Sequence, residues 1–489
     1  MIEEANSKME KEGPEASMLP SGKPPPQTSE GAKTPQYLIT LAATMAAFAG
    51  GNVIGWSAPA LPYLEAPDSP LPVTSHESSW IGSLLAIGAF IGALPAGPVA
   101  DYFGRKITVI SLAAPILISW IMIYFASSVY IIYIARLIGG FGIGAICTTV
   151  PMYVSEIAEA SIRGTLCSAF QLMLVCGILY TYILGAIVSY NLLPIVCGII
   201  PLIFIAAFFK APETPAYLLK KDQRQRAENA LVTLRGTQYN VFKELHALEN
   251  DLNQDTGSKP SFVKAAMKRA SLLALVICLG LMLFQQLSGI NIVIFYTGNI
   301  FKDAGSTLDP ALATIFVGLA QVVSTVVSGI LIDKAGRKIL LQVSASIMCI
   351  CLLVLGWYFH IKEKGGDTAS ISLLPLLSVV LYILVFAIGF GPIPWMMTGE
   401  ILPSEIKGVA TGIAVALNWC LAFTVTKSFS TLIETMGAAK TYWLFGFICL
   451  IGFLFSTFVV IETKGKSLAE IQNELSGKKS DEQRRNQMI

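Results

Sequence analysis

Twelve apolar stretches, separated by polar segments, dominate this sequence. A helix needs about 20 residues to cross roughly 30 Å of hydrocarbon, and only helices satisfy their own backbone over such runs, whereas barrel strands would show weak alternating segments. With 54% hydrophobic and 13% charged residues, the chain is too apolar for a soluble domain. We therefore predict an all-α membrane protein with twelve transmembrane helices, at 37–61, 80–100, 107–126, 130–154, 165–188, 191–209, 271–298, 311–332, 339–360, 372–397, 409–432 and 441–461.

A charged loop signature occurs twice, as DYFGRK at 101–106 and as DKAGRK at 333–338. Two further echoes follow in the same order. SEIAEASIRG at 155–164 is answered by GEILPSEIKG at 399–408, and PETPAYL at 212–218 by IETKGKSL at 461–468. A repeat this long indicates two half-proteins rather than solenoid units. Because the loops recur in the same order, they predict a parallel repeat, as in transporters whose halves are related by an axis along the membrane normal.

The basic residues predict the orientation. Most of the 34 lysines and arginines fall in the two tails and in alternate loops, and such loops stay inside the cell. Both termini are therefore expected in the cytoplasm, with no signal peptide before the first span. The expected organisation is a disordered tail at 1–35, a six-helix half at 36–210, a cytoplasmic linker with short helices at 211–270, a second six-helix half at 271–465, and a cytoplasmic tail at 466–489.

Motifs of energy-using or catalytic proteins are missing from the sequence. Gly465-Lys466-Ser467 resembles the end of a P-loop, but Val460 stands where the leading glycine belongs. The three histidines have no neighbouring metal ligands, and the nine cysteines lie in apolar spans, as free packing thiols do. A net charge of +2 gives no nucleic-acid signal. We expect a monomer that is not an enzyme and that uses no ATP, nucleic acid, metal or cofactor.

Opposite charges occupy the expected cytoplasmic ends of helices in both halves. Arginine favours bidentate pairing with carboxylates, and carboxylates near lipid need partners. Pairs that are intact in one state and broken in the other would set the balance between outward-open and inward-open forms. A solvated surface is the alternative, and for Lys106 and Lys338 it is favoured. The predicted cytoplasmic latch comprises Asp101, Arg105, Glu156, Arg163, Glu213, Asp333, Arg337, Glu400, Lys407 and Glu462.

Several motifs together resemble the sugar porters of the major facilitator superfamily. They are QQLSGIN at 285–291, PIPW at 392–395, PMYVSE at 151–156, PET at 212–214, ETKG at 462–465 and the paired GRK loops. The resemblance covers about residues 36–475, and the loops are most similar to those of insect facilitated trehalose and glucose transporters. It implies a facilitative sugar transporter of the plasma membrane with trehalose or glucose as substrate. A proton-coupled carrier of sugar or polyol and a transport-inactive sugar sensor remain alternatives.

Uncharged amides within the apolar spans fit a sugar. Each amide offers donors and an acceptor to hydroxyl groups without the desolvation cost of a charge, and Trp395 offers a flat apolar face. The alternative is a polar contact between helices, worth about 0.6 kcal/mol. The predicted substrate-binding residues are Gln171, Gln285, Gln286, Asn291, Gln321, Trp395 and Asn418, and the predicted gating residues are Tyr296, Phe390, Gly391, Pro392 and Pro394.

Two of these spans are expected to be broken. Gln285 and Asn291 are six positions apart, about 240° of net rotation, so a straight helix would not direct both at one ligand. Gly289 between them predicts a local break. Gly389 and the prolines of PIPW interrupt the tenth span, as a fixed kink or as a hinge.

The absence of a carboxylate in the first span bears on whether transport is coupled to protons. Proton-driven sugar porters carry a carboxylate in the first span, and the matching residue here is Asn52. Residues 36–62 contain no Asp or Glu, and the span of Arg136 offers no evident carboxylate, so a proton relay lacks its parts and facilitated diffusion is expected. Ala387 and Ala422 replace larger polar residues of the family, which would leave room for a disaccharide such as trehalose.

Overall fold

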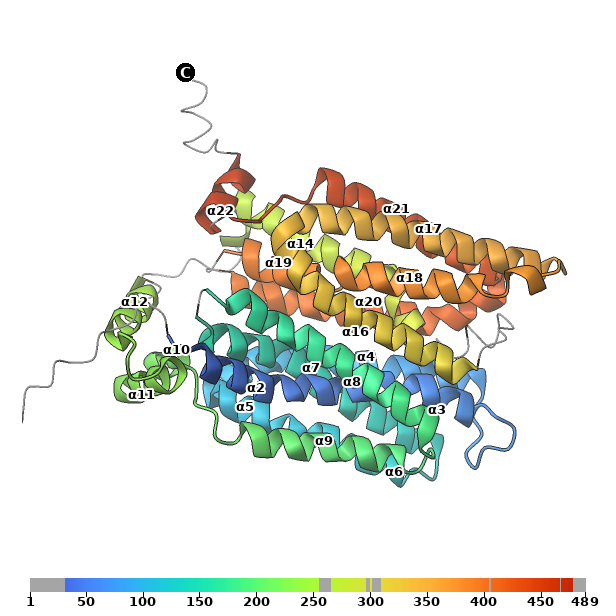
Figure 1. The fold of residues 1–489 in the computed structure, drawn as a ribbon, viewed down its shortest axis with the longest axis horizontal. Coiled ribbons are helices and arrows are strands. Elements are labelled where there is room, and N and C mark those ends of the chain that lie inside the picture. Colours follow the sequence, from blue (N-terminus) through green and yellow to red (C-terminus); the bar gives the residue numbers. More distant parts are fainter. Residues whose placement is uncertain are drawn as a thin grey trace, which may run out of the picture.

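The computed structural model describes residues 31–159, 161–254, 265–295, 300, 309–403, 406–466 and 468–477. Figure 1 shows two groups of long helices lying side by side, one from each part of the chain. In the part that the structure describes, eleven helical segments are long and apolar enough to cross a membrane, and Leu193–Phe208 is a shorter apolar helix. The predicted all-α, twelve-helix architecture is confirmed.

Short connections separate the helices within each group. The first group contains α2 (Lys33–Gly55), α3 (Ser57–Leu64), α4 (Ser75–Phe103), α5 (Arg105–Ser111), α6 (Ala113–Tyr124), α7 (Val129–Ile157), α8 (Arg163–Ile187) and α9 (Leu193–Phe208). The second group contains α14 (Arg269–Leu287), α16 (Pro310–Ala335), α17 (Arg337–Glu363), the 3-10 turn η1 (Ala369–Ile371), α18 (Leu374–Ile388), α19 (Ile393–Ile401), α20 (Lys407–Met436) and α21 (Ala438–Phe458).

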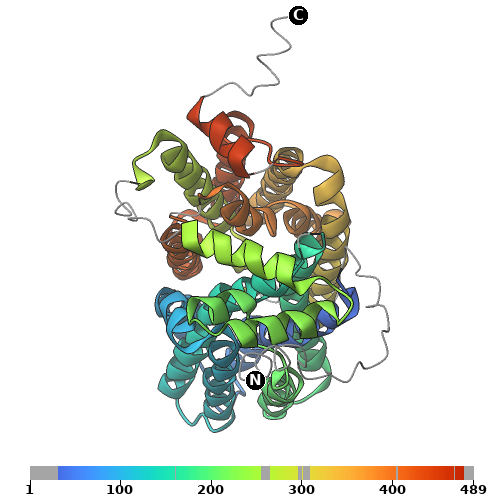
Figure 2. The same cartoon turned by 90° about the vertical axis from the view of Figure 1, so that its left-hand side faces the viewer.

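Three more helices connect the two groups and cap one end of the molecule. They are α10 (Pro215–Lys220), α11 (Arg224–Arg235) and α12 (Val241–Gln254), and a fourth short helix, α22 (Leu468–Ser476), follows the second group. Figure 2 views the molecule from the end that carries these helices. We call this end the linker side and the opposite end the far side.

The linker helices are fastened to the first group by Arg235. Its guanidinium bonds both carboxylate oxygens of Glu244, at 3.1 and 2.7 Å, and donates to the Ile157 carbonyl at 2.8 Å. That carbonyl lies at the end of α7, where a cation also meets the negative pole of the helix. The Ala32 N–H in turn donates to the Arg235 carbonyl at 2.7 Å. The start of the first helix is therefore tied to the linker helices.

The structure moves several predicted boundaries. The first helix begins at Lys33, so the predicted tail at 1–35 is too long by three residues; residues 1–30 lie outside the described part. The predicted tail at 466–489 contains the amphipathic helix α22, which buries Ile471 and Leu475 and packs against α14. The apolar content of the sequence predicted neither the start of the first helix nor helix α22, because both depend on contacts with distant segments.

Glycines allow α4 and α7 to approach closely. A Cβ atom on Gly140 would lie 2.1 Å from the Leu85 carbonyl oxygen, and one on Gly144 would lie 1.9 Å from the Ala89 carbonyl oxygen. In lipid, where helix association relies on close packing, small residues mark such contacts. Gly140 and Gly144 are therefore packing residues between these two helices.

We expect Gly144→Val to destabilise the protein, because the new side chain would collide with helix backbone that cannot move aside. Overpacking typically costs about 1–3 kcal/mol, and a clash with backbone puts this change at the upper end. Thermal unfolding of the detergent-solubilised protein measures the loss. The matched control is Gly97→Val in the neighbouring helix α4, where an added Cβ meets no atom within 4 Å. Equal melting temperatures for the two variants would contradict this assignment.

Candidate functional site

The seventh span is interrupted where the sequence predicts a break. Helix α14 ends at Leu287, Gly289 has a φ of +90°, and the chain is helical again over 290–295. Tyr382 of α18 holds the break, since its hydroxyl lies 3.0 Å from both the carbonyl and the hydroxyl oxygen of Ser288. The Ser288 hydroxyl in turn donates to the Gln285 carbonyl at 2.7 Å. Neighbouring side chains thus satisfy the polar groups at the break, as membrane proteins require.

The tenth span is interrupted as well, between α18 and α19. Gly389 follows α18, and a Cβ there would lie 2.5 Å from the Ser344 side chain and 2.6 Å from the Leu340 carbonyl oxygen. The Gly391 N–H donates to the Phe386 carbonyl at 2.7 Å. The carbonyls of Phe390 and Gly391 are thereby left to face α14.

Four of the predicted amides form one continuous network between these two breaks. Asn291 donates a short hydrogen bond to Gln286, which donates to the Asn418 side-chain oxygen at 2.7 Å. Asn418 of α20 donates to the Gln285 side-chain oxygen at 2.7 Å. Gln285 then donates to the carbonyls of Phe390 at 2.7 Å and Gly391 at 2.9 Å. The network joins α14, α20 and the break before α19.

The amides of this network are buried, with exposed fractions of 3% for Gln285, 7% for Gln286 and 1% for Asn418, while Asn291 is half-buried. A buried amide without a partner is costly. Each amide here forms a hydrogen bond with a neighbouring amide, so the site is polar although its polar groups already have partners within the protein.

The other predicted site residues lie outside the network. Gln171 on α8 is half-buried and Gln321 on α16 is 4% exposed, and no hydrogen bond joins either to the four amides among the described residues. Trp395 on α19 is half-buried and packs against the hydrophobic core. Phe390 is 2% exposed. Pro392 caps α19 and Pro394 lies in its first turn, next to the break, while Tyr296 lies outside the described residues.

Sequence reasoning missed the residues that support the network. Tyr382 and Ser288 hold the break, and the Met282 sulfur lies 3.3 Å from the Asn418 nitrogen. A hydroxyl or thioether inside an apolar span gives no sequence signal of its own, because such groups are common there as packing residues.

A cavity of about 260 Å³ lies elsewhere, on the far side between α3, α8 and α16. Pro59, Tyr182 and Thr314 are among its lining residues, and none of the predicted sugar-binding residues reaches it. Most of its lining is apolar. The amide network, not this cavity, is the candidate site.

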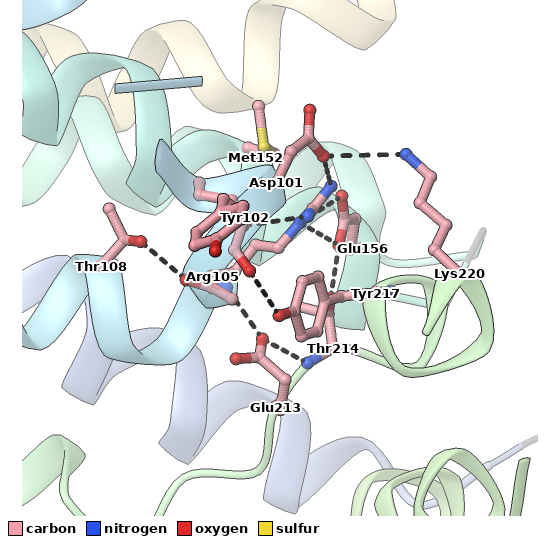
Figure 3. Close-up of polar contacts among 12 residues, drawn as sticks. Asp101, Tyr102, Arg105, Thr108, Met152, Glu156, Glu213, Thr214, Tyr217 and Lys220 are labelled. Carbon is pink, nitrogen blue, oxygen red and sulfur yellow. Dashed lines mark hydrogen bonds and ion pairs between the residues drawn. The ribbon is translucent and has the colours of Figure 1, made fainter. Parts of the chain in front are cut away.

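On the linker side, the first charged cluster surrounds Arg105 (Figure 3). Its guanidinium pairs with Asp101 at 2.8 Å and with Glu156 of α7 at 3.1 Å. Glu213 receives the backbone N–H groups of Arg105 and Lys106, at 3.1 Å each, across the start of α5. A carboxylate at a helix N-terminus is stabilised by the free N–H groups and by the helix dipole.

The second group repeats this cluster. Arg337 pairs with Glu400 of α19 at 3.0 Å, and Glu462 receives the backbone N–H groups of Arg337 and Lys338 at 3.0 Å each. The side chain of Asp333 lies outside what the structure describes. Gly336, with φ +90°, is required here because a Cβ would lie 2.6 Å from the Glu462 carboxylate.

A threonine completes each cluster. Thr214 and Thr463 directly follow Glu213 and Glu462, and each hydroxyl lies 2.5 Å from a carboxylate oxygen, of Glu156 and Glu400 respectively. The sequence analysis missed both threonines. The signal was available, since a Glu-Thr pair occurs in both copies of the repeat.

Arg163 and Lys407 stand apart from these clusters. Glu156 bonds Arg105 and Thr214 rather than Arg163, and Glu400 bonds Arg337 and Thr463 rather than Lys407. The Lys407 ammonium instead donates to the Gly399 carbonyl at 2.7 Å. Partial burial and the guanidinium of Arg163 both lower the pKa of Lys407. The two cations thus belong to different helix groups and repel each other across the linker side.

The two equivalent glutamates differ in their electrostatics. Burial raises the pKa of Glu213 despite three backbone hydrogen bonds and the nearby Arg105. Burial also opposes ionisation of Glu462, but four backbone N–H groups outweigh it and lower the pKa of that carboxyl. The ionised carboxylate therefore stabilises the second cluster more than the first.

With this geometry established, the fold defines the class of protein. The proton:xylose symporter XylE bound to 6-bromo-6-deoxy-D-glucose superimposes with a TM-score of 0.76 at 27% identity, over 90% of this chain and 99% of that one. An inward-open structure of the E. coli xylose transporter gives 0.74 at 26% identity, over 90% and 99%. The chain has the fold of the major facilitator superfamily. The family described as "Sugar (and other) transporter" matches residues 28–475, and the chain belongs to this family.

Individual proteins with known names are also similar to this chain. The facilitated trehalose transporter Tret1 of Polypedilum vanderplanki is 39% identical over 445 residues, which make up 91% of this chain and 88% of that protein. Tret1 of Drosophila mojavensis is also 39% identical over 91% of this chain, but only 52% of its own length is covered. This chain thus spans about half the length of several of the relatives that it matches.

We expect Glu462→Gln to cost about 1 kcal/mol of stability near pH 7, in the range of exposed charged hydrogen bonds. Because folding lowers the pKa of this carboxyl, its ionised form stabilises the fold above its ordinary pKa, and that contribution is lost as the pH falls below about 4. The difference between variant and wild type should therefore shrink in acid. Thermal unfolding of both proteins near pH 7 and below about pH 4 measures this difference.

The repeat supplies the matched control. Folding raises the pKa of Glu213, so its ionisation disfavours the fold as the pH rises, and Glu213→Gln should cost less near pH 7 than Glu462→Gln. Equal losses in the two variants, or a Glu462→Gln loss that persists in acid, would contradict the predicted asymmetry.

Proposed function

We propose that this protein is a facilitative sugar transporter, a uniporter that works by alternating access and carries trehalose, glucose or both. The observation that carries the proposal is the closed amide network of Gln285, Gln286, Asn291 and Asn418 beside two broken helices. These amides lie in the middle of apolar spans, where a sugar would otherwise find no hydrogen-bonding partner. The family match and the printed names of the Tret1 relatives support a sugar as the substrate.

The network also suggests how binding is coupled to movement. Gln285 bonds the carbonyls of Phe390 and Gly391, which belong to the break before α19. A sugar hydroxyl that takes the Gln285 amide would release these carbonyls and loosen the break. Helix α19 carries Trp395 and Glu400, so its movement would affect both the proposed site and the second charged cluster. The predicted gating residues Phe390, Gly391, Pro392 and Pro394 all belong to this junction.

Trehalose is the favoured substrate on size. Ala387 and Ala422, which replace larger polar residues of the family, are 3% and 1% exposed and face the interior. Smaller side chains at these two positions would leave more room for a second sugar ring. The relatives named for trehalose transport agree with this choice.

A proton-coupled carrier is the alternative, because the solved relative XylE is named a proton:xylose symporter. The surroundings of Arg136 speak against it. Its guanidinium donates to the carbonyls of Val53 at 2.5 Å and Ile81 at 3.1 Å and to the Ser57 hydroxyl at 2.7 Å, and it lies over the Trp56 ring. Neutral groups thus satisfy this cation, and no carboxylate contacts it among the described residues. A proton relay would need such a carboxylate.

The linker side is proposed to face the cytoplasm, as the basic loops predict. This places both termini inside and the protein in the plasma membrane, with the lipid bilayer and the sugar as its partners and no further subunit required. The latch residues would then control the inner opening.

Loss of the Gln285 amide should weaken sugar binding. The test is counterflow of labelled trehalose and glucose into liposomes that contain only this protein. We expect Gln285→Ala to raise the KM by about tenfold, because two hydrogen bonds from this amide to the sugar, of about 0.5–1.5 kcal/mol each, would be lost. The matched control is Gln342→Ala, whose amide bonds Thr457 away from the network. Unchanged transport by Gln285→Ala would remove the network from the binding site, and no counterflow by wild type would favour the sensor.

Uniport makes a second prediction. In the same liposomes, an imposed pH gradient should neither drive sugar above its equilibrium concentration nor change the initial rate with its direction, because no titratable carboxylate accompanies the sugar. A pH-sensitive dye in the lumen should report no proton movement during uptake. Alkalinisation of the medium on sugar addition would establish the proton-coupled alternative.

A further inference from the structure

The two helix groups meet along two seams, α4 against α20 and α8 against α16, and the two ends of these seams differ. On the far side, the Tyr182 hydroxyl of α8 donates to the Ile294 carbonyl at 2.9 Å, and a Cβ on Gly318 of α16 would lie 2.9 Å from the Tyr182 ring. Nearer the linker side, a Cβ on Gly329 or Gly412 would meet no atom within 4 Å. The groups are therefore in direct contact on the far side, whereas these two glycines on the linker side have open space beside them.

A single lysine bridges the α4–α20 seam near its far end. The Lys427 ammonium of α20 lies 4.2 Å from the centroid of the Trp80 ring of α4 and 3.3 Å from the Ser79 hydroxyl oxygen. Phe423, four positions before Lys427, places its ring centroid 6.4 Å from that of Trp80. Among the described residues no carboxylate pairs with Lys427. The cation is held by an aromatic face and a hydroxyl group, both from the opposite helix group.

This arrangement is unusual for a charge within an apolar span. An ammonium group at such a place is costly and needs a partner inside the protein. A cation over an indole ring gains more when both are partly removed from water, and both side chains are half-buried here. The contact is therefore strongest when α4 and α20 touch on the far side.

We propose that Lys427 and Trp80 form a clasp that holds the far side closed and must open before the site faces that side. Since the two partners lie in different helix groups, the contact exists in one state and is absent in the other. An interaction confined to one state shifts the equilibrium between the two. When the far side opens, water can hydrate the freed ammonium. The clasp rests on the proposed alternating access, but not on the identity of the sugar.

The clasp is also independent of the carboxylates that characterise the linker side. There each arginine pairs with glutamates of its own helix group. On the far side one cation and one ring act between the groups instead. The far-side clasp therefore adds a residue to the transport cycle that neither the charged loops nor the amide network includes.

Hydrogen–deuterium exchange of the full-length protein in lipid nanodiscs tests the clasp. We expect Lys427→Met and Trp80→Leu each to raise deuterium uptake at 75–85 and 423–436 on the far side and to lower it at 163–171 and 407–415 on the linker side. The ratio of far-side-open to far-side-closed protein should rise by about 5- to 30-fold, the range of a partly buried cation–π contact.

Two further variants exclude a merely structural effect. Lys427→Arg should keep the wild-type pattern, because a guanidinium also stacks over an aromatic ring. The double variant Lys427→Met with Trp80→Leu should shift uptake no further than either single variant, because both remove one contact. Unchanged uptake in Lys427→Met, raised uptake on both sides, or additive shifts in the double variant would each overturn the clasp. Sugar counterflow in liposomes that contain the same variants tests the proposed transport separately, since exchange reports the conformations with or without a transported sugar.

Discussion

The structure depends on one constraint, which is that a polar group surrounded by hydrocarbon must find its partner within the protein. Regular helices meet it for the backbone, and so most of the chain is helical. Where a helix is broken, at Gly289 and at Gly389, side chains take over: Tyr382 and Ser288 at the first break, and the Gln285 amide at the second. The places where the backbone departs from a helix are thus the places where polar side chains gather. A binding site for a polar solute arises from the same requirement.

The amide network offers a physical reason why the proposed site is stable when empty and still able to bind a sugar. Its members satisfy one another when no ligand is bound, so the empty site costs little. A sugar offers hydroxyl groups that both donate and accept, and it can exchange for these internal bonds one by one. A charged residue in the same place would bind more strongly, but it would need a fixed counter-ion in both states. Amides allow the partners to change without leaving a charge unpaired.

The sequence predicted the membrane spans and the important polar residues better than it predicted which side chains contact one another. Apolar length predicted the spans, and the rotation between Gln285 and Asn291 together with Gly289 correctly indicated a broken helix. The charge pattern marked Arg105, Glu156 and Glu400 for a latch, but the pairing follows the tertiary fold: Arg105 and Glu156 are 51 positions apart and meet only because α5 packs against α7. Lys427 lay outside the sequence analysis altogether. A lysine within an apolar span has no partner that spacing could reveal, because Trp80 comes from the other half of the chain.

The two ends of the molecule differ in whether their contacts belong to the sequence repeat. On the linker side, both copies place one glutamate over the start of a helix and pair an arginine with a second glutamate, and each of these contacts lies within one helix group. These clusters make each group rigid without joining the two, and the like charges of Arg163 and Lys407 oppose their approach. On the far side, Tyr182 and Lys427 lie outside the duplicated loops and bind directly across the seam. We therefore infer that the duplicated loops stabilise each helix group by itself, whereas residues outside these loops decide which end of the molecule is closed.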